Sequence, residues 1–506
     1  MSKKRVFCLL LSLLVLLCAL PFPAAAADET APDDVYCNWY EVFVYSFADS
    51  DGDGIGDLNG LREKLPYIQQ LGCGGIWLMP IMPSPSYHKY DVTDYYAVDP
   101  QYGTLEDLRA LLEAAHGMGI RVILDLPINH SSEQHPWFLS AAADESSPYR
   151  DYYNWSDSAK TGYTEKDGLW YESRFVSSMP DLNLENPAVR EEIRNILSYW
   201  LCDVGVDGFR LDAVTSYYTG DVGANVAFLD WLADTAHSLS PGCFLVAEAW
   251  ENLATLSRYS VSRIDSFFTF PVSQNEGFIA KVLMPRVKEP GVRFGNSVLE
   301  LEQSLDAASI PAPFLENHDT GRTVGFTGRQ DPDRTKMAGG LLCMMRGALF
   351  LYYGQEIGMV GSGDDPNKRI GMLWTTEAET TTPPPGVTKL EYAYPSVAEQ
   401  DGDPLSLLNY YRHALALRGR YPAIARGASR ILPCEDGSLC LIERSWNGQS
   451  VLLAINLSRS EARLDLSGDA ALYSELADSL TVSEAPVTLQ DGSLLLPGYG
   501  IALLLS

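Results

Sequence analysis

The sequence is short of positive charge and has no closely spaced cysteine pairs. Its 506 residues include 37 Lys and Arg against 66 Asp and Glu, which gives a formal net charge of −29. Such a field repels phosphate backbones and anionic lipid, so the sequence argues against nucleic acids and membrane surfaces as partners. A neutral sugar polymer would be indifferent to it. Because no CxxC pair occurs, a cysteine-based zinc site is not indicated.

Long apolar runs are missing except at the N-terminus. Lys3, Lys4 and Arg5 precede an apolar run over residues 6–20, and small residues follow at 24–27. This pattern predicts a signal peptide over residues 1–27 that is cleaved near Ala27. The run is short for a membrane span, and no later segment is apolar enough for one. We therefore expect a secreted protein that is free of the membrane after signal removal, and a monomer.

Cysteine is also scarce, with nine in the chain and an odd seven after the leader. Cys434 and Cys440 flank an Asp-Gly turn. They could close a bridge across a hairpin or remain two free thiols, and the sequence favours neither outcome.

Strand-like and helix-like sequence patterns alternate along most of the chain. Between about residues 38 and 420, short β-branched or aromatic runs are followed by amphipathic helical patterns. Thr104 and Asp107 form a predicted capping box, and Asn186-Pro187 is expected to open a helix that runs to Trp200. The expected strands are 41–47, 75–79, 121–126, 206–211, 244–248, 263–270, 312–316 and 348–353. Eight strands alternating with helices predict an α/β fold, the (β/α)8 TIM barrel.

Two segments depart from this alternation. Residues 127–186 are too many for a loop between strand and helix and are rich in Ser, Tyr and Asp, which predicts a small domain inserted after the third strand. The barrel would then comprise 38–126 and 187–420. Residues 421–506 contain period-two runs, with Asn-Gly at 447–448, and predict a C-terminal antiparallel β-sandwich domain.

Four of the expected strands end in carboxylates, at the barrel face where enzymes of this fold carry their catalytic groups. A single acid there could be a helix cap or a surface charge. Four such ends, three of them with His or Arg as well, indicate a catalytic site. The segments are Asp125-Leu-Pro-Ile-Asn129-His130, Gly208-Phe-Arg210-Leu-Asp212, Glu248-Ala-Trp and Phe314-Leu-Glu-Asn317-His318-Asp319.

These segments, in this order, resemble those of the α-amylase superfamily of retaining glycoside hydrolases (family 13). Gly354-Gln-Glu-Ile after the eighth strand fits the same family. Met179-Pro-Asp-Leu-Asn183 is similar to a group intermediate between oligo-1,6-glucosidases and neopullulanases, which includes secreted α-amylases.

The resemblance implies a role for each carboxylate. Asp212 would be the nucleophile that forms a covalent glycosyl-enzyme, Glu248 the general acid and base, and Asp319 the group that grips sugar hydroxyls in the transition state. Arg210 stands two residues before Asp212, so the two side chains project to one face of the strand. We expect Arg210 to keep Asp212 ionised, and the pKa of Glu248 to be raised.

Three further residues are expected to bind the sugar. The resemblance implies that His130 and His318 donate hydrogen bonds to its hydroxyls. Tyr90, in a segment similar to the family's second-strand loop, would stack on the same sugar. The alternative for Tyr90 is a tyrosine packed in the core.

An acidic, glycine-rich loop follows the first strand, with Asp49, Asp51, Asp53 and Asp57 at alternating positions. Ca²⁺ prefers six to eight oxygen ligands, and the spacing matches the first half of an EF-hand loop, in which Ile55 would offer its backbone carbonyl. The twelfth position is a glycine rather than a glutamate, so the loop is not an EF-hand. Many relatives in the family carry calcium in a similar loop, and we expect Ca²⁺ here as a structural cofactor. A plain acidic turn is the alternative.

The substrate expected is an α-glucan. Tyr87-His88 resembles α-amylases with an open cleft, whereas exo-acting members often carry an acidic residue in place of Tyr87. We therefore expect an endo-acting α-amylase that cleaves internal α-1,4-glucosidic bonds of starch or maltooligosaccharides by double displacement. An exo-acting α-glucosidase, an oligo-1,6-glucosidase or a transglycosylase is the alternative. A non-catalytic glucan-binding relative would have lost carboxylates that this chain keeps.

Overall fold

The structure is a computed structural model that describes residues 34–329 and 331–506. The expected signal peptide lies outside the described residues. Across those two ranges, no helix combines the length and apolarity needed to cross a bilayer.

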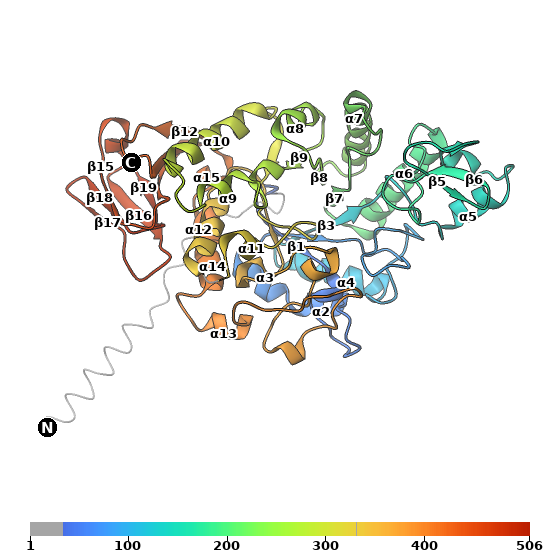
Figure 1. Ribbon diagram of the computed structural model, residues 1–506, viewed down its shortest axis with the longest axis horizontal. Helices are drawn as coiled ribbons and strands as arrows, with labels where there is room; N and C mark the ends of the chain where they lie inside the picture. Colours follow the sequence, from blue (N-terminus) through green and yellow to red (C-terminus); the bar gives the residue numbers. More distant parts are fainter. Residues whose placement is uncertain (1–33, 330) are drawn as a thin grey trace, which may run out of the picture. The chain divides into compact units, whose positions relative to one another are not determined.

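Eight parallel strands form one sheet in the order β10-β9-β8-β7-β3-β2-β1-β11 (Figure 1). The strands are β1 (Asn38–Val42), β2 (Gly75–Leu78), β3 (Arg121–Leu126), β7 (Gly208–Leu211), β8 (Phe244–Ala247), β9 (Ser266–Phe268), β10 (Ile310–Ala312) and β11 (Leu349–Tyr352). Each is followed by at least one helix. The barrel helices are α3 (Leu65–Leu71), α4 (Leu105–Gly117), α6 (Pro187–Ser198), α7 (Val222–Leu239), α8 (Leu253–Tyr259), α10 (Pro290–Ser304), α12 (Pro332–Cys343) and α14 (Leu407–Arg420). The predicted (β/α)8 barrel is confirmed.

The sheet closes through two prolines. Pro311 O accepts a hydrogen bond from Ala348 N (2.8 Å), and Pro313 O accepts one from Phe350 N (3.0 Å). Proline has no N–H to give back, so these two closing contacts run in one direction only. The prediction that β10 occupies 312–316 was wrong, because the paired residues are Ile310–Ala312. Prolines can stand at this edge because they take part in the pairing only through their carbonyl oxygens.

The bounds predicted for the first strand, β1, were also wrong. Residues 41–47 were expected, but pairing covers Asn38–Val42, and Val44–Ser46 form a 3-10 turn. A parallel strand buried on both faces shows no alternation of apolar and polar residues. The apolar run of β1 therefore continues past the last paired residue, and the sequence does not mark where the strand ends.

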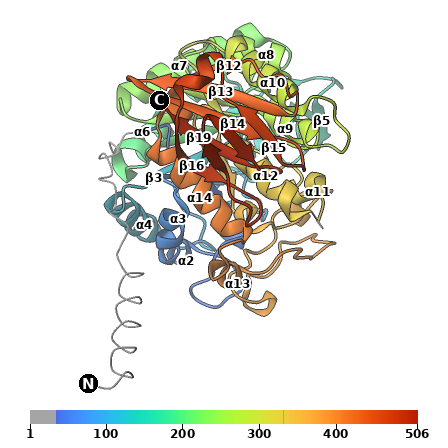
Figure 2. The same cartoon turned by 90° about the vertical axis from the view of Figure 1, so that its left-hand side faces the viewer.

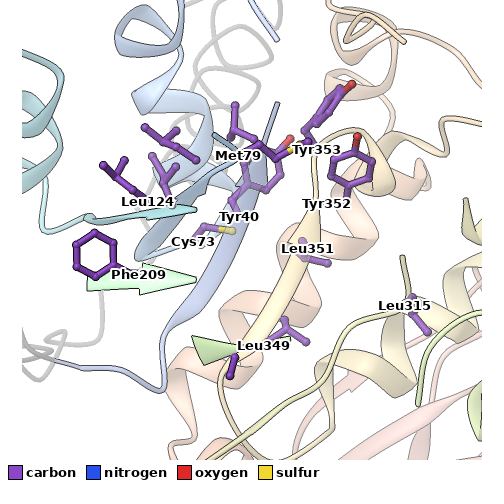
Figure 3. Packing of buried hydrophobic residues seen from close by; sticks show 14 of the residues in the cluster. Tyr40, Cys73, Met79, Leu124, Phe209, Leu315, Leu349, Leu351, Tyr352 and Tyr353 are labelled. Carbon is purple, nitrogen blue, oxygen red and sulfur yellow. The ribbon is translucent and has the colours of Figure 1, made fainter. Parts of the chain in front are cut away.

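The core has two layers. Inside the barrel, Trp39 stacks between Phe244 and Phe350, with ring centroids 5.0 and 5.8 Å apart. Between strands and helices lies a second layer that includes Tyr40, Phe209 and Leu351 (Figure 3). Since successive side chains of a strand point to opposite faces, each strand feeds both layers.

The predicted helix starts are confirmed, and one helix extends beyond its predicted end. Thr104 and Asp107 form the predicted capping box of α4, and the Asn186 side chain accepts from Ala188 N at the start of α6. The regular helix ends at Ser198 and continues as a π-helical turn over Tyr199–Val204, beyond the expected end at Trp200.

A small antiparallel sheet lies between β3 and α6 in the chain, with the order β4-β6-β5. Its strands are Trp155–Ser156 (β4), Tyr163–Lys166 (β5) and Leu169–Glu172 (β6), and helix α5 (Pro136–Ala143) precedes them. All four elements fall within the segment 127–186. Figure 1 shows them on the side of the barrel away from the C-terminal strands.

The C-terminal strands form two antiparallel sheets, ordered β12-β13-β14-β19-β16 and β15-β18-β17 (Figure 2). Asn447 and Gly448 have φ values of 47° and 79°, which suit the tight turn between β13 and β14. Cys434 and Cys440 are free thiols, so the hairpin bridge is not formed. The strands are β12 (Ala428–Leu432), β13 (Leu439–Trp446), β14 (Gln449–Asn456), β15 (Ala462–Asp465), β16 (Glu475–Leu480), β17 (Thr488–Gln490), β18 (Ser493–Leu496) and β19 (Ile501–Leu505).

Helix α10 joins the C-terminal strands to the barrel by a close backbone contact. A Cβ atom added at Gly291 would lie 2.1 Å from the carbonyl oxygen of Leu439, and one at Gly295 would lie 3.1 Å from Cys440 Sγ. Since backbone cannot swing away as a flexible side chain can, the first position tolerates only glycine.

We therefore expect Gly291→Ala to lower the free energy of unfolding by about 1–3 kcal/mol, the usual cost of overpacking. The measurement is the midpoint of thermal or urea unfolding. Gly117→Ala, also in a helix but with open space around the new methyl group, is the matched control and should leave that midpoint unchanged or slightly raised. Equal midpoints for the two variants would contradict the close contact.

Candidate active site

Arg210 lies at the centre of a group of buried carboxylates. Its Nη1 is 2.6 Å from Asp212 Oδ1 and 2.9 Å from Asp125 Oδ1, and its Nη2 is 3.0 Å from Glu248 Oε2. The guanidinium is fully buried and lies 5.1 Å from the ring of Trp77. One cation thus bridges the two residues predicted to be nucleophile and proton donor.

The barrel itself brings these residues together. Asp125 of β3 is the register partner of Arg210 on β7, and Asp212 follows two residues later, on the same face of the strand. Glu248 comes directly after β8, the neighbour of β7 on the other side. Ala213 adopts a left-handed φ of 47°, and its N–H donates to Glu248 Oε2 (3.0 Å). The unusual backbone at Ala213 therefore helps to fix the second carboxylate.

The environment of Glu248 suits a proton donor. Burial raises the pKa of Glu248 to about 7, with the charges of Asp212 and Asp319 adding to the effect and Arg210 opposing it. At neutral pH this carboxyl group is partly protonated, which general acid catalysis requires.

A second chain of contacts runs through His318. Its Nδ1 lies 2.6 Å from Glu41 Oε1, and its Nε2 lies 3.0 Å from Asp319 Oδ2 and 2.7 Å from the Tyr90 hydroxyl. Burial lowers the pKa of His318, but Asp319 and Glu41 outweigh this and raise it to about 9. The imidazole is therefore a cation at neutral pH.

Asp319 is held as a carboxylate by two cations. Burial opposes its ionisation, but His318 and then Arg369, whose Nη2 is 2.8 Å from Asp319 Oδ1, keep the pKa of Asp319 well below its usual range. It can only accept hydrogen bonds, as a group that grips sugar hydroxyls must.

Tyr90 lies between the two chains of contacts. Its hydroxyl donates to Asp125 Oδ2 (2.9 Å), and its ring stacks on that of His318, with centroids 5.5 Å apart and planes 18° apart. The side chain is only partly buried, so one part of the ring packs on His318 and another part faces solvent.

His130 carries a polar atom that the described part of the protein leaves without a partner. Its Nε2 is buried and accepts or donates no hydrogen bond there. Burial lowers the pKa of His130, so the ring is neutral at pH 7 and can donate one hydrogen bond. The half-exposed Phe175 packs edge-on against it, with centroids 5.3 Å apart. A ligand hydroxyl is the natural partner for this nitrogen.

Four residues of the site were given no role of their own in the sequence analysis. Asp125 stands in one of the strand-end segments, and Glu41 is a charged residue inside an apolar strand, so both left a signal. Phe175 lies just before Met-Pro-Asp-Leu-Asn and is marked only by that neighbourhood. Arg369 lies after β11, beyond the Gly354-Gln-Glu-Ile segment, and no motif includes Arg369 itself.

The acidic loop after β1 gathers three of its carboxylates. Ligand oxygens of Asp49, Asp51 and Asp57 all lie within 4.8 Å of one another. Asp57 also caps helix α2 (Leu58–Glu63). The Asp53 carboxylate lies outside this group and accepts from Ile55 N (2.7 Å). Three clustered oxygen donors fit a hard cation such as Ca²⁺, and the expected ligands are brought together in part.

The same loop is tied to the segment that carries Arg369. Ser46 Oγ donates to Arg369 O (2.6 Å), and Thr382 N donates to Gly54 O (2.7 Å). Ser46, just before the acidic loop, and Gly54 within it therefore link this region to the segment that carries Arg369, the partner of Asp319.

Residues 41–427 match the family model described as the α-amylase catalytic domain. "Alpha-amylase 3" of Dictyoglomus thermophilum is 38% identical over 441 residues, covering 84% of this chain and 85% of that protein. "Trehalose synthase/amylase TreS" of Mycobacterium tuberculosis is 34% identical, covering 88% and 86%. The solved structure of Eubacterium rectale Amy13B superposes with a TM-score of 0.90 at 41% identity, covering 94% of this chain and 96% of that one.

The pH dependence of catalysis should report Glu248. The carboxyl group must be protonated to act as an acid, so kcat/KM for a maltodextrin should fall as the pH rises through about 7. The measurement is kcat/KM between pH 5 and pH 9. A profile that stays flat to pH 9 would contradict the assignment of the proton donor.

Proposed function

The chain belongs to the α-amylase family, and from this premise we propose that it is an endo-acting α-amylase that cleaves internal α-1,4-glucosidic bonds of starch and maltodextrins. The observation that carries the chemistry is Arg210, which bridges Asp212 and Glu248. Retaining glycosidases hold these two carboxyl groups about 5–5.5 Å apart, and a guanidinium shared by both keeps them at short range.

The mechanism follows from the state of each group. Asp212, ion-paired with Arg210, attacks the anomeric carbon while Glu248 gives its proton to the leaving oxygen. Glu248, now a carboxylate, then takes a proton from water, which hydrolyses the glycosyl-enzyme with retention. Asp319, ionised throughout, accepts hydrogen bonds from hydroxyls of the distorted sugar and favours its positive charge.

Endo action is supported by the residue at the rim of the site. Tyr87, where exo-acting relatives often carry an acid, accepts a hydrogen bond from Arg369 Nη1 (3.5 Å) and lies 5.8 Å from its guanidinium. Tyr87 therefore places a hydroxyl, and not a carboxylate, at the position where an acid could hold the end of a glucan chain. The large negative charge of the protein is also compatible with a neutral polymer.

Product sizes over time test this function. An endo enzyme acting on amylose should release mixed oligosaccharides early, while an exo enzyme releases one small product. Glu248→Gln should lower kcat by at least about 10²-fold, because general acid catalysis contributes roughly 10²–10⁴-fold. Undiminished hydrolysis by that variant, or a single small product from the start, would overturn the proposal.

We also propose that Ca²⁺ binds the loop of Asp49, Asp51 and Asp57, where it would offset their mutual repulsion and stabilise the loop. Chelation should lower the melting temperature, and Ca²⁺ should restore it, since a ligand at 100 times its Kd stabilises a protein by about 2.7 kcal/mol. Asp49→Asn should abolish the calcium-dependent shift. Asp157→Asn, an exposed acid outside the loop, should not. An unchanged melting temperature after chelation would refute the calcium site.

A further inference from the structure

Lys89, the residue before Tyr90, has a backbone conformation that favours glycine. Its φ is 65°, in the left-handed region that residues with a Cβ atom rarely adopt. Such a conformation persists only where the surrounding structure holds it, and functional sites are where it is often found. The contacts of the Lys89 side chain show what holds this turn.

A buried ion pair fixes the Lys89 side chain. Its Nζ lies 2.7 Å from Asp99 Oδ2 and donates to Gln101 Oε1 (2.7 Å). Only 2% of Lys89 and 4% of Asp99 is exposed, and the ammonium lies 5.5 Å from the centroid of the Tyr102 ring. Because a buried charge is costly to leave unpaired, this pair sets the direction in which the lysine points.

The segment that carries Asp99 is bonded to the barrel. Asp99 N donates to Ile81 O (2.7 Å), shortly after β2. Tyr102 O accepts from Leu58 N (3.0 Å) at the start of α2. The ion pair therefore ties Lys89 to a segment that has its own backbone contacts with two barrel elements.

Tyr90, the next residue, reaches different partners. Its hydroxyl lies 2.9 Å from Asp125 Oδ2 and 2.7 Å from His318 Nε2, and its ring stacks on that of His318. Lys89 and Tyr90 are adjacent in the chain, so the left-handed turn at Lys89 sets the angle between the two side chains. A change in that turn would move the Tyr90 ring relative to His318.

We propose that the Lys89–Asp99 ion pair positions the active-site tyrosine. It holds residue 89 in the left-handed region and so keeps the Tyr90 ring on His318. Lys89 acts through Tyr90 and does not touch the substrate, which makes it a positioning residue. The inference rests on the proposed function only in that Tyr90 is taken to meet the sugar.

Two variants that delete the same side chain isolate the effect of the backbone. Lys89→Ala and Lys89→Gly both remove the ammonium, but only glycine adopts the left-handed conformation without strain. Lys89→Ala should lower kcat/KM for maltoheptaose roughly tenfold, equivalent to about 1.4 kcal/mol, because fewer molecules hold Tyr90 in place. Lys89→Gly should restore most of that loss. Equal losses in the two variants would overturn the proposal.

A double-mutant cycle tests whether Lys89 acts through Tyr90. In a Tyr90→Ala background, Lys89→Ala should change kcat/KM less than about twofold, since the ring that it positions is already gone. If Lys89→Ala causes the same loss with and without the tyrosine ring, Lys89 does not act through Tyr90 and the proposal fails.

Asn447 provides a matched control, since it also has a left-handed φ, 47°, in the turn between β13 and β14. Asn447→Ala should lower the melting temperature but leave kcat/KM unchanged. A loss of kcat/KM as large as that in Lys89→Ala would mean that any strained turn has this effect, against the proposal. Lys89→Met, which keeps the aliphatic stem and removes the charge, should show the same loss and serves if Lys89→Ala is insoluble.

Crystal structures of the two Lys89 variants give a readout that needs no substrate. The Tyr90 hydroxyl should lose its contacts with Asp125 and His318 in Lys89→Ala and keep them in Lys89→Gly. An unmoved Tyr90 in Lys89→Ala would refute the inference and leave the proposed function intact. If the unsubstituted chain does not cleave maltoheptaose, the proposed function fails, and the position of Tyr90 in the two variants still decides the inference.

Discussion

The burial of one guanidinium among three carboxylates is the constraint on which the site depends. A buried charge is tolerated only when it is paired, and Arg210 is paired with acids from the ends of three adjacent strands. One positive charge cannot compensate three negative ones in a dry environment. The pKa values of two of these acids are therefore raised, to about 6 for Asp125 and about 7 for Glu248, with burial as the main cause. Arg210 opposes this rise, so it is burial together with the neighbouring carboxylates Asp212 and Asp319 that keeps a proton on the residue that must donate it.

The other half of the site is supported from further away. Asp319 pairs with Arg369, and Arg369 is positioned by a loop whose backbone is bound to the segment between β1 and α2. Trp374 adds a contact of the same kind, since its Nε1 donates to Phe47 O (2.7 Å). The acidic turn at 49–57 lies in that segment. The turn itself contributes Gly54 O to these contacts, which accepts a hydrogen bond from Thr382 N (2.7 Å).

How much of this could be predicted from the sequence depends on where each residue stands in the fold. Parallel strands of a barrel end at one face, so Arg210, Asp212 and Glu248 could be assigned to a common site from their positions at strand ends alone. Glu41 reaches His318 from the strand before the motifs begin, and Arg369 arrives from a loop whose path depends on tertiary contacts. No local sequence pattern predicts that either residue lies in the site. Strand limits failed for a similar reason, because β1 is apolar beyond its last pair and β10 closes the barrel through proline carbonyls.

The three residues after β8 differ in what holds them. Glu248 faces Arg210, Ala249 is buried, and Trp250 rests on Phe270. Because contacts with Ala213 N and Arg210 fix the Glu248 carboxyl group just beyond the strand, this group needs no moving part to reach the leaving oxygen. Binding energy from sugars remote from the cleaved bond could then position the leaving oxygen, which raises the rate of the chemical step only if the alignment is best in the transition state. A carboxyl group held by two neighbouring residues meets that condition, since its position does not depend on the substrate.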